Sequence, residues 1–71
     1  MAPKFKPLQW IVYKVDNSQY LGQIKSASYI TRQGTTEWNY DVKSEGGRIQ
    51  SVPEQDINFY FENDEYVSAI S

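Results

Sequence analysis

One long segment, residues 20–32, constrains the fold more than any other part of the chain. It opens as a strand with "YLGQI" and then carries the small-residue run "SAS" at 26–28, which packs poorly in a flat sheet. Gly22 lets a second backbone or a bulky ring approach closely, and small side chains tolerate a β-bulge. The segment therefore predicts a bent strand that serves two sheets, as in a small barrel without a covering helix.

The remaining strands are predicted from apolar residues that alternate along the chain. Residues 8–15, "LQWIVYKV", are apolar at both parities, which is typical of a strand covered on both faces. Residues 38–44, "WNYDVKS", have the clearest period of two, and "RIQSV" at 48–52 is a short fourth strand. In the third strand we expect Trp38, Tyr40 and Val42 to face inward and Asn39, Asp41 and Lys43 outward. Two further sets share a parity: Tyr20, Ile24 and Ile30 in the long strand, and Ile57, Phe59 and Phe61 in the fifth.

Clusters of turn-forming residues separate these strands and predict hairpins. They are "DNSQ" at 16–19, "QGTTE" at 33–37 and "EGG" at 45–47. Pro53 ends the fourth strand, and "PEQD" at 53–56 suits one 3-10 turn, because proline fixes φ and acidic residues favour the amino end. Residues 62–65, "ENDE", predict either the loop of a last hairpin leading to the strand "YVSAI" or a helical turn capped by Asp64; the strand is preferred. No 3.6-residue period runs long enough for a helix.

The chain is expected to form one domain, because 71 residues cannot be divided into two pieces that each bury a core. Within it we expect residues 1–7 to be a flexible arm, residues 8–61 a barrel, and residues 62–71 a C-terminal hairpin strand or tail. Cysteine and histidine are absent, which excludes thiolate and imidazole metal sites and removes the commonest general base. A polar amino terminus and the lack of any apolar run of membrane length predict a cytoplasmic protein with no membrane partner.

The spacing of five strands, with a one-turn helix before the last, resembles the SH3-like barrel and, more narrowly, its Tudor-like branch. The resemblance rests on "YLGQI" after the first hairpin, on "YDVKSEGGRI" at 40–49 as the third hairpin, and on "VPEQDI" at 52–57 as the closing turn. It covers residues 8–61. It implies an all-β, small SH3-like barrel of five or six antiparallel strands with one 3-10 turn near residues 53–56.

The same resemblance raises the prediction of an aromatic cage. Tudor-like domains that bind methylated lysine or arginine box the cation with rings, one at the end of the first strand and another at the start of the second. Tyr13 and Tyr20 stand at those places, whereas residues 43–46, "KSEG", replace the family's remaining rings. Trp38 and Tyr40 complete the candidate ligand-binding residues, and Tyr13, Tyr20 and Trp38 are also expected to line a groove for an extended peptide. The alternative is that these rings pack the core.

A second resemblance concerns catalysis. "GQI" at 22–24 and "IQSVP" at 49–53 are similar to pieces of the plasmid-borne type II dihydrofolate reductase, an SH3-like barrel that assembles as a tetramer around a pore. In that family a glutamine, an isoleucine and a tyrosine before the proline line the pore where folate and NADPH meet. Gln50 matches the glutamine, but Ser51 and Val52 replace the other two. The resemblance implies a shared fold rather than the reaction.

Charge does not favour polyanionic partners. The net charge is −2, and the seven Lys and Arg residues are scattered among nine Asp and Glu, so a small barrel that binds nucleic acid is only an alternative. The acidic group Glu62, Asp64 and Glu65 matches no calcium-binding loop. We expect a non-catalytic module without a cofactor that binds a protein, a peptide or a second copy of itself. Self-association is suggested by the small core and by the apolar excess of "NFYFENDEYVSAI" at 58–70.

Overall fold

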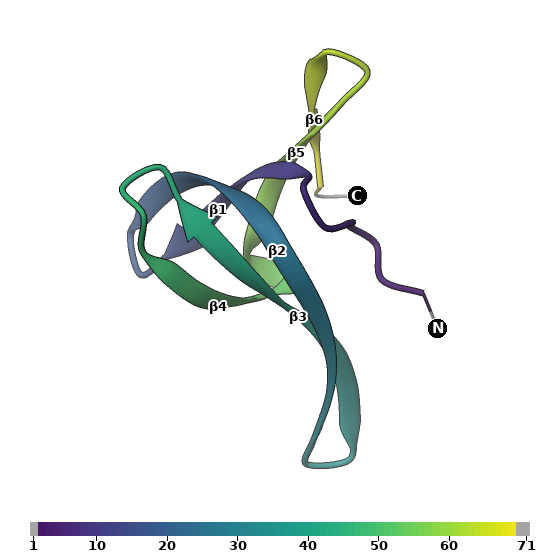
Figure 1. Cartoon of the computed structure of the whole chain (residues 1–71). Helices are drawn as coiled ribbons and strands as arrows, with labels where there is room; N and C mark the ends of the chain where they lie inside the picture. The colour runs from purple at the N-terminus through teal and green to yellow at the C-terminus, as the bar shows by residue number, and fades with distance from the viewer. Residues whose placement is uncertain (1, 70–71) are drawn as a thin grey trace.

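The computed structural model describes residues 2–69, which form one antiparallel sheet of six strands, one 3-10 turn and no α-helix. The elements are β1 (Trp10–Val15), β2 (Ser18–Arg32), β3 (Thr35–Ser44), β4 (Ile49–Pro53), η1 (Glu54–Asp56), β5 (Ile57–Glu62) and β6 (Glu65–Ser68). The strand order is β4-β3-β2-β1-β5-β6, and Figure 1 shows that the sheet is strongly curved. The all-β prediction, the 3-10 turn and the final strand are confirmed. Among the described residues β4 and β6 are the two edges of the sheet, and no pairing closes it.

β2 is the long bent strand that the sequence predicts. Its first part pairs with β1 as far as Gln23, and its second part pairs with β3 out to Arg32. A register shift between Ile24 and Ser26 marks a bulge at the start of the small-residue run, and Figure 1 shows the strand curving along its length. The bulge moves Ile30 off the face that Ile24 occupies, because one extra residue reverses the alternation. The prediction that these two isoleucines share a face is therefore wrong.

Two strands carry apolar residues on a face that no residue within 2–69 covers. In β1, Ile11 and Tyr13 are buried whereas Trp10 is exposed, so the prediction of a strand covered on both faces is wrong. In β5, the pairing with β1 is irregular between Val12 and Tyr13, and of the three residues predicted to share a parity, Ile57, Phe59 and Phe61, only Ile57 is buried. The physical reason is the same in both strands: the single sheet curves around one core, and no second layer of described residues packs on its outer side.

β3 follows its predicted alternation with one exception. Tyr40 and Val42 are buried as expected, and Asp41 and Lys43 are exposed. Asn39 was expected outward, yet it is buried. It pairs with Ser28 of β2 and with Pro53 of β4, at the point where the chain turns into η1.

The core collects side chains from the N-terminal segment and from strands β1 to β5. Its buried apolar residues are Phe5, Ile11, Tyr13, Ile24, Tyr40, Val42, Val52 and Ile57. Phe5 comes from the segment expected to be a flexible arm; residues 2–7 form no strand, but the ring of Phe5 is only 1% exposed. It packs against Tyr40 and Tyr60 with ring centroids 5.6 and 5.3 Å apart. The ring of Phe5 thus anchors the N-terminal segment to the core of the sheet.

The hairpin turns are tighter than predicted. Gln33 and Gly34 link β2 to β3, and Asn63 and Asp64 link β5 to β6, each pair with positive φ at both positions. Positive φ at both central residues is the geometry of type I′ turns, which match the twist of a two-stranded ribbon. The predicted turns at 33–37 and 62–65 therefore shorten to two residues, because their flanking residues pair as strands. No helix in the described part of the chain could span a membrane.

Candidate functional site

Tyr13 and Tyr20 form a pair, as their places in the first hairpin predict. They lie directly opposite each other on β1 and β2, with ring centroids 5.9 Å apart. Tyr13 is fully buried and its hydroxyl donates to Oε1 of Gln50 at 3.5 Å. Burial, and secondly the neighbouring Tyr20, raises the pKa of the Tyr13 phenol. Only Tyr20 of this pair presents its ring to a ligand.

The pocket beside Tyr20 is polar rather than aromatic. It measures about 580 Å³ and is lined by residues that include Tyr20, Glu45, Arg48 and Gln50. Tyr20 is the one ring in this lining, so these residues cannot box a methylated cation as a cage of several rings does. Gln50, which matches the reductase glutamine, lines the same pocket.

Trp38 and Tyr40 lie away from that pair. Trp38 packs on Tyr29, at 4.7 Å between ring centroids, on the distal half of the β2–β3 ribbon. Both line a separate pocket of about 550 Å³ that shares no residue with the pocket beside Tyr20. Tyr40 is buried in the core, where its hydroxyl donates to Oε2 of Glu54 at 2.6 Å. The structure therefore does not bring the four predicted residues into one groove.

Tyr40 accounts for an expected pH dependence of stability. Burial, then the hydrogen bond to Glu54, raises the pKa of Tyr40 above its ordinary value of 10.0. The phenol therefore loses its proton more readily in the unfolded chain than in the folded one. Its contribution to the free energy of unfolding is complete below pH 10.0 and is lost as the pH rises above that value. We expect Tyr40→Phe to lower the free energy of unfolding by about 1.5 to 3 kcal/mol near neutral pH. We also expect the free energy of unfolding of this variant to fall less at alkaline pH than that of the wild type. Urea unfolding across pH measures both effects.

The matched control for this prediction is Tyr20→Phe, which removes a hydroxyl from a ring that is exposed rather than buried. If the free energy of unfolding fell with rising alkaline pH as steeply in Tyr40→Phe as in the wild type, another group would be responsible for the pH dependence.

Four exposed rings gather on the outer side of the sheet instead. We define the outer aromatic face as Trp10, Leu21, Phe59, Phe61 and Tyr66. The register explains it: Val12 pairs with Leu21 and with Phe59, and Phe61 pairs with Tyr66, so these side chains point to the side opposite the core. Trp10 is 38% exposed and Tyr66 48%, and the rings of Phe61 and Tyr66 meet edge to face at 5.1 Å.

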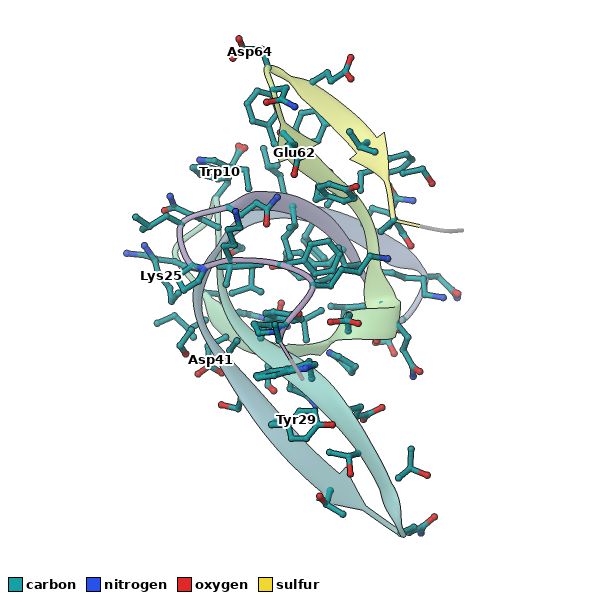
Figure 2. The ribbon with its side chains drawn as sticks, turned by 90° about the vertical axis from the view of Figure 1, so that its right-hand side faces the viewer. Trp10, Lys25, Tyr29, Asp41, Glu62 and Asp64 are labelled. Carbon is teal, nitrogen blue, oxygen red and sulfur yellow. The ribbon has the colours of Figure 1, made fainter. Side chains whose placement is uncertain are left out.

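The outer aromatic face is hollowed at its centre. A pocket of about 250 Å³ is lined by Trp10, Leu21, Glu45, Phe61 and Tyr66. In Figure 2 Trp10 lies on the same side of the molecule as Asp64, and Tyr29 lies toward the opposite end. Sequence reasoning missed this site, although its signal was present. β1 is apolar at both parities and β5 has consecutive rings at 59–61, and only the fold says which parity is covered.

The charges around this face are unequal. The chain beyond Arg48 contains five acidic residues and no lysine or arginine. Glu62 pairs directly with Glu65 across the β5–β6 hairpin, and Asp64 lies in its turn. Like charges placed opposite each other in a sheet repel. No group of metal-ligating side chains converges within residues 2–69.

Comparison with known proteins gives no match: no protein-family model, no curated protein and no solved structure is significantly similar to the chain. Function is therefore inferred from the geometry of the chain itself.

Proposed function

We propose that this protein is a non-catalytic interaction module, built on a small SH3-like barrel, that binds protein segments through its outer aromatic face. The observation that carries this proposal is the gathering of Trp10, Phe59, Phe61 and Tyr66 on one uncovered side of the sheet, each more than a third exposed. Large contiguous apolar patches are uncommon on monomers and mark interaction surfaces. Tryptophan, tyrosine and phenylalanine are also the residues enriched at protein interfaces.

Two features of the fold support the barrel. β2 pairs with β1 from Ser18 to Gln23 and with β3 from Gly22 onward, and it carries a bulge between Ile24 and Ser26. A bulge in a long strand is a device by which a small sheet turns a corner. The 3-10 turn η1 stands between β4 and β5, directly before the fifth strand, where the resemblance to SH3-like barrels requires one.

The amount of exposed surface supports a partner. The chain exposes 5007 Å². A monomeric protein of 8.3 kDa is expected to expose roughly 4600 Å². Among the described residues, the exposed large apolar side chains are as numerous as the buried ones, and half of them lie on β1, β5 and β6. Removing such an apolar surface from water by binding a partner lowers the free energy of the system.

Selection of peptides from a random display library tests the proposal. We expect peptides to be enriched on the wild-type protein and to lose binding by at least about tenfold on Tyr66→Ser, because truncating a central ring removes a large part of the contact. Chemical shifts on adding an enriched peptide are expected to map to β1, β5 and β6.

Tyr29→Ser is the matched control. Tyr29 is 46% exposed against 48% for Tyr66, and each ring packs on one other aromatic ring. Tyr29 lies outside the outer aromatic face, so its loss should leave binding unchanged. Enriched peptides whose shifts map to Tyr20 and Arg48 instead, or equal losses in the two variants, would contradict the proposal.

A further inference from the structure

The central pocket of the outer aromatic face combines rings with a carboxylate. Trp10, Phe61 and Tyr66 supply three rings, and Glu45 supplies the one charged side chain of the lining. Its volume of about 250 Å³ lies below the range of roughly 300 to 1,000 Å³ that is usual for small-molecule and cofactor sites. The pocket therefore suits a single side chain of a partner better than a cofactor.

The chemistry of this lining favours a cation. A ring face attracts a positive charge through its quadrupole, most strongly when the ring is tryptophan. A carboxylate beside the rings adds a charge-assisted hydrogen bond, which a guanidinium can make with two parallel donors. Glu45 is held in place through its backbone, since its N–H donates to the carbonyl of Leu21 at 3.1 Å.

The charges of the neighbouring β5–β6 hairpin also favour a cationic partner. Glu62 and Glu65 lie opposite each other across β5 and β6, on the side of the hairpin away from Phe61 and Tyr66, and Asp64 adds a third negative charge in the turn. No salt bridge joins these three carboxylates to any other described side chain. These charges do not line the pocket, but the negative potential that they give to this end of the sheet would attract a basic segment and speed the encounter.

We propose that the partner of the outer aromatic face is a basic protein segment, with one arginine or lysine side chain seated between Trp10, Phe61 and Tyr66 and paired with Glu45. The inference rests on the proposed function and names the chemistry of its partner. The pocket is formed by strands β1, β2, β5 and β6 with the turn after β3. Neither Tyr13 nor Tyr20 lines it, although Leu21 and Glu45 also line the pocket beside Tyr20.

The lysines of the sheet set the direction of the bound segment. Lys43 pairs with Gln23 on the outer side of the sheet, and Nζ of Lys25 donates to Oε1 of the same glutamine at 3.2 Å. Figure 2 shows Lys25 on the side of Trp10 away from Asp64, with Asp41 beyond it. Asp41 accepts a hydrogen bond from the Ser26 hydroxyl. A basic segment is repelled by Lys25 and Lys43, so it runs from the pocket along the β5–β6 hairpin.

The composition of the selected peptides is the first test. Peptides enriched on the wild-type protein, and lost on Tyr66→Ser, are expected to contain arginine or lysine beside an apolar residue far more often than the unselected library. The most enriched peptide and an analogue with glutamine at every arginine and lysine are then titrated. The analogue is expected to bind at least about tenfold more weakly, and raising the salt from about 0.05 M to about 0.5 M is expected to weaken the parent peptide only.

Charge variants of the protein give the second test. Glu45→Gln is expected to weaken the parent peptide about fivefold, which is the upper effect of one partly exposed ion pair, and to leave the analogue unchanged. Lys43→Gln is expected to tighten binding about twofold, a direction that damage to the fold would not give. Glu37→Gln is the control, since Glu37 lies in β3 on the distal ribbon.

The outcomes separate the two proposals. Face-binding peptides without arginine or lysine, or a second copy of the chain as the tightest ligand, would overturn this inference and leave the proposed function standing. No enrichment on the wild-type protein would overturn both.

Discussion

Phe5→Ala is expected to unfold most of the protein at room temperature. The Phe5 ring is 1% exposed, and its backbone N–H donates to the Tyr40 hydroxyl at 3.3 Å. Truncating a buried phenylalanine costs about 3 to 5 kcal/mol. A single core in a domain of this size supplies about the same amount, so little stability remains. Urea unfolding followed by tryptophan fluorescence measures the loss.

Phe59→Ala is the matched control, because it removes the same ring from a position that is 38% exposed. We expect it to cost well under half as much as Phe5→Ala. Equal midpoints of unfolding for the two variants would mean that the N-terminal segment is not part of the core.

This anchor could not be predicted from the sequence. Phe5 is one ring among lysines and prolines, and the segment has no period of two or 3.6 that would assign it to an element. Its burial depends on contacts with the rings of Tyr40 and Tyr60, which lie far along the chain. Local composition predicts irregular backbone correctly, but it does not say whether irregular backbone packs on the core.

For a related reason, the sequence predicts which residues of the candidate site share a face but not whether that face is exposed. Alternation predicts which residues of a strand share a face, and it gave Tyr40 and Val42 correctly as buried. It does not say how many faces of the sheet are covered. The apolar residues of β1 therefore predict a strand covered on both faces, whereas the sheet covers one face and presents Trp10 on the other. Bulges further limit the prediction of which face a side chain occupies. The register shift after Ile24 reverses the alternation of β2, and no unique pattern in the sequence marks its position.

The bent strand itself was predictable, because its requirement is local and steric. A Cβ atom at Gly22 would lie 2.7 Å from Cγ1 of Val42, 2.8 Å from the backbone oxygen of Lys43 and 3.0 Å from Cε1 of Tyr13. β1, β2 and β3 approach each other at this point, and no side chain other than hydrogen fits there. The prediction that Gly22 lets a second backbone or a bulky ring approach closely is thus confirmed, and here both do.

Gly22→Ala is accordingly expected to be the most damaging single methyl addition in the chain. Overpacking a core typically costs about 1 to 3 kcal/mol, and we expect the upper end here, because the contact with the backbone of Lys43 cannot be relieved by a rotamer change. Gly46→Ala is the control: its nearest contact would be Oγ of Ser44 at 3.9 Å, which is an ordinary separation. Denaturant midpoints of the two variants measure the difference. If the midpoint of Gly22→Ala fell no further than that of Gly46→Ala, the three strands would not meet at Gly22, and the bend of β2 would need another cause.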